Sequence, residues 1–182
     1  VGIGTDDPDQ QLEVSGNIKL GNNMMVEGSN DYTVYRNLAS YYSATSSATG
    51  AFVIKTNQPK FAMWTMTIKG HFQGTREFFE ITVGGLGNQN QLGYISDGDH
   101  DLSVRVGLDG DSLVVILGET SDVFNFPMIT VTEFRQAYSA KDEAYADGWN
   151  ITQETDLSAY LPLFSASEEN SLTWLENGDD IY

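Results

Sequence analysis

Short segments in which apolar and polar residues alternate recur along this chain, and they constrain its fold more than any other feature. The segment Ala62–Lys69 places large apolar side chains at every second position. After a turn at Gly74-Thr75, Phe79–Val83 repeats the pattern. A period of two puts successive side chains on opposite faces of a strand. We therefore expect a β-hairpin over residues 62–83, with one face of each strand buried.

Further strands are predicted towards the C-terminus, with almost no helical periodicity between them. Leu102–Leu108 alternates, and Leu113–Leu117 is apolar on both faces, as in a central strand. Pro127 is expected at the edge or the start of the strand that follows, and Ile151–Leu157 is expected to add a last strand. Gln136–Asp147 contains the only plausible helical turn. The sequence thus predicts an all-β head, an antiparallel, jelly-roll-like β-sandwich.

The first residues have a different character. In Val1–Thr5 two aliphatic residues alternate with glycines, so the glycine face would allow another backbone to approach closely. Asp7-Pro8 predicts a turn, and Leu12–Leu20 predicts a short hairpin around Ser15-Gly16-Asn17. An isolated two-stranded hairpin is marginally stable in water. This N-terminal hairpin is therefore expected to need a partner surface, either the rest of the chain or copies of itself.

Two parts of the sequence resemble known fibre proteins. Residues 1–17, VGIGTDDPDQQLEVSGN, resemble the repeat VGIGTTxPxxxLxVxGN of phage tail fibres and of some trimeric bacterial surface fibres. Gly50–Tyr160 is similar to a domain that occurs beside such repeats in tail-fibre proteins, including those of marine phages. The matching segments are VIKTN at Val53–Asn57, the run from Leu108 to Gly118, FPMITVTE at Phe126–Glu133, and Asp147–Tyr160.

The resemblance implies a trimeric stalk that carries a receptor-binding head in the tail fibre of a virion. It implies host attachment as the function, with a host-surface glycan as the natural ligand class and neighbouring fibre domains as partners. It supplies no catalytic residue. We expect a stalk and linker over residues 1–48, a head over 49–162, and a connector over 163–182 towards a further stalk element. The small-residue run Ser43–Gly50 supports the first boundary.

The charge balance excludes several classes of partner. Nine Lys and Arg residues face twenty-six Asp and Glu residues, which gives a formal net charge of -17. This charge would repel a phosphate backbone or an anionic membrane surface, so nucleic acid is not an expected partner. No apolar run approaches the roughly twenty residues that span a bilayer, so membrane insertion is not expected either. Because there is no cysteine, disulfides and thiolate chemistry are excluded.

One acidic segment has the composition of a cation site. Asp97, Asp99 and Asp101 place three carboxylates at alternate positions, and carboxylate oxygens are ligands of calcium. An EF-hand loop that began at Asp97 would need glycine at Leu102 and glutamate at Leu108, so that motif fails. The expected reading is a solvated acidic turn without a bound metal or cofactor, with a bound cation as the alternative.

No catalytic group emerges from the remaining residues. His71 and His100 are the only imidazoles, and no Gly-x-Ser-x-Gly elbow presents a nucleophile. His71 is expected at the surface near a strand end. A carboxylate pair for glycoside hydrolysis is always available among twenty-six acidic residues and is therefore uninformative. We expect a non-enzymatic module. The alternatives are a structural spacer in a fibre and a glycan depolymerase whose active site lies between subunits.

Four aromatic residues are candidates for stacking on sugar rings: Tyr41, Tyr42, Trp149 and Tyr160. An aromatic ring combines an apolar face with, in tyrosine and tryptophan, a polar edge. Most aromatic residues of a β-sandwich lie in the core, so each candidate is more often a packing residue than a contact to a receptor. The receptor-binding residues are left open by the sequence.

Overall fold

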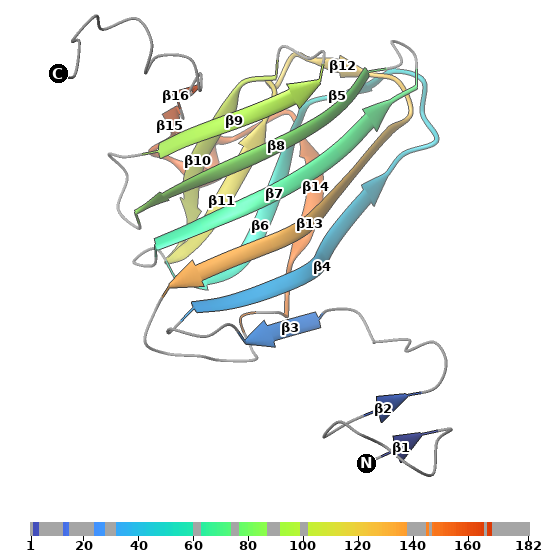
Figure 1. Ribbon diagram of the computed structural model, residues 1–182. Helices are drawn as coiled ribbons and strands as arrows, with labels where there is room; N and C mark the ends of the chain where they lie inside the picture. The colour runs from blue at the N-terminus through green and yellow to red at the C-terminus, as the bar shows by residue number, and fades with distance from the viewer. Residues whose placement is uncertain are drawn as a thin grey trace, which may run out of the picture.

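The computed structural model describes residues 2–3, 13–14, 24–27, 32–59, 63–73, 77–86, 92–98, 102–137, 145, 147–165 and 167–168. The largest sheet has seven strands, and Figure 1 shows it face-on. Its order is β16 (Ser167–Glu168), β9 (Leu92–Gly98), β8 (Glu77–Leu86), β7 (Met63–Phe72), β13 (Pro127–Ala137), β4 (Tyr32–Tyr42) and β3 (Met24–Glu27). All neighbours pair antiparallel except β16 and β9.

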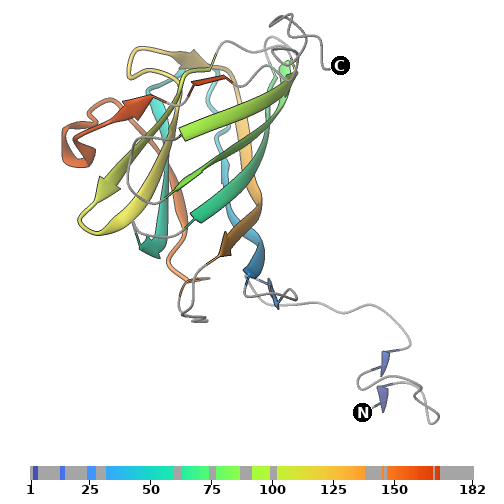
Figure 2. The ribbon, with the colours of Figure 1, turned by 60° about the vertical axis from the view of Figure 1, so that its left-hand side comes forward.

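A second sheet of five strands packs against one face of the first, as Figure 2 shows. Its order is β14 (Asn150–Glu154), β6 (Ala51–Pro59), β11 (Ser112–Leu117), β10 (Val104–Asp109) and β15 (Phe164–Ser165), all antiparallel. The short strands β5 (Ala48–Thr49) and β12 (Val123–Phe124) pair with each other. The described residues contain no α-helix, and the segment Ser158–Tyr160 forms a 3-10 turn, η2. The predicted all-β antiparallel sandwich is thus confirmed.

The alternating segments form the strands that the sequence predicts. β7 and β8 form the expected hairpin, with Ile68 directly opposite Ile81. The exposed-buried alternation along β7 leaves its apolar residues facing the smaller sheet. β13 begins at Pro127, where the missing N–H of proline costs least. β14 covers most of the last predicted strand.

The main core lies between the two sheets and contains two groups of aromatic rings, one towards each end of β7. The Phe52 ring lies 4.6 Å from that of Phe124 and 6.1 Å from that of Phe72, measured between centroids. Phe134 packs between Trp64 and Trp149, at 6.1 Å and 5.0 Å. Stacked, tilted and edge-on aromatic pairs such as these add to the stabilisation from burial. These rings fix how the two sheets face each other.

β11 is buried on both faces, as its continuous apolar run predicts. Val115 and Leu117 point into the main core. On the opposite face, Val114 and Ile116 pack against Leu157, Tyr160 and other residues of a second, smaller cluster. The segment that carries η2 therefore covers the outer face of the smaller sheet. Gly107 allows this close approach, because a Cβ there would lie 2.5 Å from the Tyr160 carbonyl oxygen.

One central strand lies where the sequence analysis placed a stalk and linker. β4 pairs with β13 along almost its whole length, so the larger sheet begins well before residue 49. The alternation of β4 is interrupted at Asn37, which has a φ of 56° and lies opposite an irregularity between Val131 and Glu133. A bulge of this kind breaks the period of two. At the other end of the head, β15 extends the smaller sheet past residue 162.

Several expectations fall on residues outside the described part. The described N-terminal residues form a short parallel pair, β1 (Gly2–Ile3) with β2 (Glu13–Val14), apart from the sandwich in Figure 1. The second arm of the predicted N-terminal hairpin, residues 18–20, lies outside the described residues. So does most of the predicted helical turn, although β13 continues into its first two positions. No helix within the described ranges is long and apolar enough to cross a membrane.

Candidate functional site

The outer face of the seven-stranded sheet carries a row of exposed side chains from four adjacent strands. Met128 on β13 lies opposite both Tyr42 on β4 and His71 on β7, and His71 lies opposite Phe78 on β8. These four residues, called here the exposed row, alternate with buried neighbours such as Phe72 and Ile129. Their side chains therefore point away from the smaller sheet.

The exposed row is unusually apolar for a solvent-facing surface. Tyr42 is 68% exposed, Phe78 is 65% exposed and Met128 is 50% exposed. Only three other large hydrophobic residues of the described part are as open to solvent, namely Met63, Val123 and Leu161. Single exposed hydrophobic residues need no explanation, but a contiguous apolar patch marks an interaction site. Three of the six exposed hydrophobic residues, Tyr42, Phe78 and Met128, lie on one line across the sheet. They therefore form such a patch.

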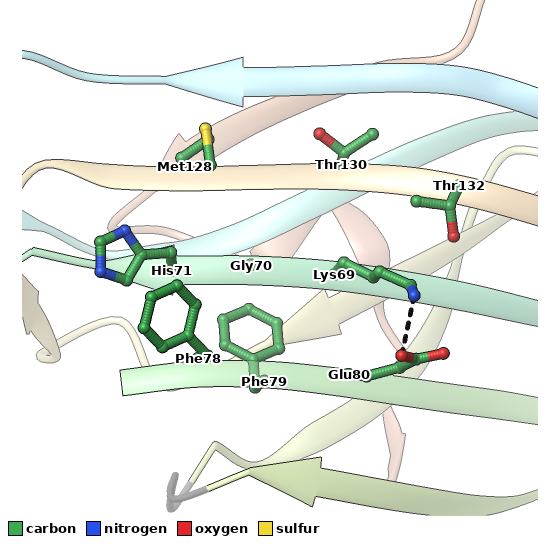
Figure 3. A pocket seen from close by; sticks show the side chains of 9 residues that line it. All are labelled: Lys69, Gly70, His71, Phe78, Phe79, Glu80, Met128, Thr130 and Thr132. Carbon is green, nitrogen blue, oxygen red and sulfur yellow. Dashed lines mark ion pairs between the residues drawn. The ribbon is translucent and has the colours of Figure 1, made fainter. Parts of the chain in front are cut away.

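A groove of about 580 Å³ runs along the exposed row, and Figure 3 shows it from close by. Strands β7, β8 and β13 each contribute three residues to its lining, which are Lys69, Gly70, His71, Phe78, Phe79, Glu80, Met128, Thr130 and Thr132. Its volume lies within the range of ligand sites in proteins. The groove is open to solvent on the sheet surface, which suits an extended ligand.

One wall of the groove is flat and aromatic. The His71 imidazole and the Phe78 phenyl ring stack with a centroid distance of 4.3 Å and an interplanar angle of 11°. The Met128 thioether stands beside them on the next strand (Figure 3). Flat apolar faces of this kind pack against the C–H faces of a sugar ring or against an aliphatic chain. This wall provides a flat contact surface, and a ligand needs no charged group to pack against it.

The neighbouring positions along the same strands form a polar row, made of Ser40, Thr130, Lys69 and Glu80. Lys69 Nζ lies 2.9 Å from Glu80 Oε2, and about half of each side chain is exposed. The hydroxyls of Ser40 and Thr130 lie 3.2 Å apart and share a hydrogen bond. Exposed ion pairs add little to stability, so these groups remain available to a ligand. An apolar row beside a row of donors and acceptors is what a polyhydroxylated ligand requires.

Of the four aromatic candidates from the sequence, only Tyr42 belongs to this surface. Tyr41 packs edge-on against Phe52 at 5.6 Å, and its hydroxyl donates to Gln153 Oε1 at 3.2 Å. Trp149 lies against Phe134, and its indole N–H donates to the Tyr145 carbonyl at 2.7 Å. Tyr41 and Trp149 are therefore structural residues of the sandwich.

Tyr160 is also structural, as part of a polar cluster on the smaller sheet. Its hydroxyl donates to both oxygens of Glu154, at 2.9 Å and 2.8 Å, and its ring lies 5.0 Å from Lys55 Nζ. Burial raises the pKa of the Tyr160 phenol. Burial alone would also raise the pKa of Glu154, but hydrogen bonds from Thr152 and Tyr160 and the charge of Lys55 outweigh it, so this pKa is lowered. The hydrogen bond with Tyr160 raises the pKa of Lys55.

The predicted metal and base candidates are only partly placed. The backbone of Asp97 lies in β9 opposite Glu80, while its side chain and residues 99–101, including His100, lie outside the described part. Among the described side chains, no group of three His, Asp or Glu residues is arranged to hold a metal ion. His71 lies next to the last residue of β7 and is half-buried, close to where the sequence analysis expected it.

Phe78 and Met128 are the two residues of the exposed row that the sequence analysis did not single out. Each stands on the otherwise polar face of an alternating strand, Phe78 beside Phe79 and Met128 beside Ile129. A large apolar residue on the polar face was the available signal. The pattern of one strand does not show which residues of other strands lie beside it.

Comparisons with protein-family models, with curated proteins and with solved structures found no match to this chain.

Proposed function

We propose that this chain is a non-enzymatic host-attachment module of a phage tail fibre that binds a host-surface glycan across the outer face of its larger sheet. The observation that carries the proposal is the exposed row, in which Tyr42, Met128, His71 and Phe78 from four adjacent strands form one apolar line beside a polar row. The resemblance of the N-terminal segment to fibre repeats supports the fibre and the virion as its setting.

The chemistry of the groove favours binding over hydrolysis. Glycoside hydrolysis needs two carboxyl groups on either side of the scissile bond. Among the described side chains, the groove lining contains a single carboxylate, Glu80, and this group is paired with Lys69. A depolymerase with an active site between subunits remains the second candidate, and it would need a carboxylate from a neighbouring copy.

The shallow groove predicts weak binding by a single head. Burial of apolar surface contributes only about 25 cal/mol per Å², and ordering a flexible glycan opposes it. In our proposal the stalk assembles the chain as a homotrimer, which raises weak contacts to useful avidity. Light scattering at micromolar concentration is expected to show a trimer, and a stable monomer would contradict this part of the proposal.

The test is binding to a panel of bacterial surface polysaccharides by biolayer interferometry. The variants Tyr42→Ala and Phe78→Ala are expected to weaken binding about tenfold or more, as aromatic contact residues do. Leu161→Ala is the matched control, because Leu161 is 63% exposed but directly follows η2, on the segment that covers the smaller sheet. Unchanged thermal unfolding would show that each variant is folded.

Three results would contradict the proposal. If Tyr42→Ala and Phe78→Ala both bound as tightly as the wild type, the exposed row would not be the contact surface. The absence of binding to every polysaccharide would favour a structural spacer. Release of reducing ends from a bound polysaccharide would favour the depolymerase.

A further inference from the structure

Three of the nine basic residues of this acidic chain lie on the middle strands of the larger sheet, on the face that carries the exposed row. The three neighbouring strands β4, β7 and β13 contain Arg36, Lys69 and Arg135 against a single acidic residue, Glu133. The whole chain has nine basic and twenty-six acidic residues. Glu80 on β8 pairs with Lys69, so the excess positive charge of these strands lies at Arg36 and Arg135.

Arg36 and Arg135 share the one carboxylate. Arg36 Nη1 lies 2.7 Å from Glu133 Oε2, and Arg135 Nε donates to Glu133 Oε1 at 2.5 Å. The side chain of Glu133 is only 15% exposed, whereas those of Arg36 and Arg135 are 48% and 57% exposed. The carboxylate thus lies beneath two guanidinium groups, and the three residues together carry one unbalanced positive charge.

The shared carboxylate also orients the arginines. A guanidinium group has five N–H donors in a planar fork that matches a carboxylate. The contacts to Glu133 use one nitrogen of each arginine. The other donors are left to bind an anionic group from solution, and they are partly ordered in advance by the bonds to Glu133. Pre-ordering lowers the entropic cost of binding.

A polar strip joins this arginine pair to the exposed row. Glu133 lies opposite Thr67 on β7, which is four residues from His71, or about 13 Å along the strand. Between them lie the polar row and the hydroxyls of Thr67 and Thr82, which are 3.2 Å apart. One ligand that lies along the strands therefore meets apolar contacts at one end, hydroxyls in the middle and guanidinium groups at the other end.

We infer that the glycan is acidic, with a carboxylate-bearing sugar held by Arg36 and Arg135 while a neighbouring sugar packs on the exposed row. This inference rests on the proposed function and names its ligand class. A neutral glycan could accept hydrogen bonds from the arginines, but only an acidic one adds a charge-assisted pair. A long polyanion would be repelled by the rest of the surface, whereas a polysaccharide with spaced carboxylates can place one of them on the arginine pair.

The experiment compares acidic bacterial polysaccharides with the same polymers after their carboxyl groups have been reduced to alcohols. The acidic forms are expected to bind about fivefold or more tightly, as for hydrogen bonds to charged groups. Arg135→Gln and Arg36→Gln are expected to remove this preference. Phe78→Ala is expected to weaken both forms equally, because it acts at the other end of the ligand.

Glu133→Gln separates an electrostatic role from a structural one. It keeps the shape of the side chain and removes the negative charge between the arginines. Acidic glycans are expected to keep their advantage over the reduced polymers with this variant, with a steeper loss of affinity between about 50 and 500 mM salt. A structural role would make the Glu133 and arginine variants weaken binding alike.

These measurements distinguish failure of the acidic-ligand inference from failure of the proposed glycan attachment. Equal binding of acidic and reduced polymers, with Phe78→Ala still impaired, would overturn the acidic ligand and leave glycan attachment in place. No binding of either form would overturn both. A salt-sensitive oligomer that Arg135→Gln dissociates, without any preference for acidic glycans, would assign the arginines to a second copy of this chain and overturn the inference.

Discussion

Replacement of Gly70 by alanine tests how the sheet beneath the groove is packed. Gly70 lies opposite Phe79, and a Cβ at position 70 would lie 2.1 Å, 2.4 Å and 3.0 Å from three carbons of the Phe79 ring. Carbon atoms in contact lie about 3.5–4.0 Å apart, so the ring would have to retreat by about 1.5 Å. Phe79 is only 4% exposed and packs on Phe72 at 5.3 Å, so it has little room to move.

The expected cost of Gly70→Ala is about 1–3 kcal/mol, the usual penalty for an overpacked core. In a chain of this size that corresponds to a fall in Tm of about 2–12 °C. Without the clash, alanine would stabilise the protein by about 0.4–1 kcal/mol, because it lowers the entropy of the unfolded chain. The sign of the change in stability therefore shows whether the clash exists.

Thermal unfolding followed by circular dichroism measures the effect. Gly110→Asn is the control, because nothing lies within 4 Å of a Cβ there and its φ of +63° suits asparagine. Its Tm is expected to stay within about 2 °C of the wild type. The double variant Gly70→Ala with Phe79→Leu is expected to recover part of the loss. An unchanged or higher Tm for Gly70→Ala would refute the packing described for these two strands.

Two further predictions concern the smaller sheet. Ile116→Ala is expected to cost about 2–5 kcal/mol in the free energy of unfolding, because Ile116 is fully buried beneath the η2 segment. A cost below about 1 kcal/mol in denaturant unfolding would show that this segment does not cover the sheet. Glu154→Gln is expected to lower stability at neutral pH. Because the folded-state pKa of Glu154 is lowered from 4.5, the advantage of the wild type is fully present above that value and is lost as the pH falls through the lowered pKa. Unfolding curves at pH 3 to 7 check this, and an advantage that grew towards low pH would contradict the sign.

The sequence predicts those parts of the fold that depend on the pattern of single strands. The hairpin over residues 62–83 and the doubly buried strand around Val115 follow from the order of apolar residues alone. The sequence pattern did not predict β4, because the left-handed Asn37 and the bulge opposite it interrupt the period of two. A local irregularity of this kind can prevent the sequence pattern from predicting a long strand inside a sheet.

The candidate site depends on register, which no single segment contains. Positions 42, 71, 78 and 128 are brought into one line only by the pairing of four strands. A shift of one residue in any pair would send that side chain to the opposite face. The pairing of β4 with β13 likewise brings together Arg36 and Glu133, which are far apart in the sequence. The sequence supplies the apolar and charged residues, and strand pairing decides which of them meet.

The most direct test of glycan attachment through the outer face is methyl NMR of the methionines during titration with a polysaccharide that binds. Met128 lies in the exposed row, Met63 lies on the same face outside the groove, and Met66 is buried in the core. We expect the Met128 methyl signal to shift in proportion to bound ligand, while the signal of the buried Met66 stays in place. A shift of Met63 with Met128 unchanged would place the ligand elsewhere and contradict the exposed row as the binding surface.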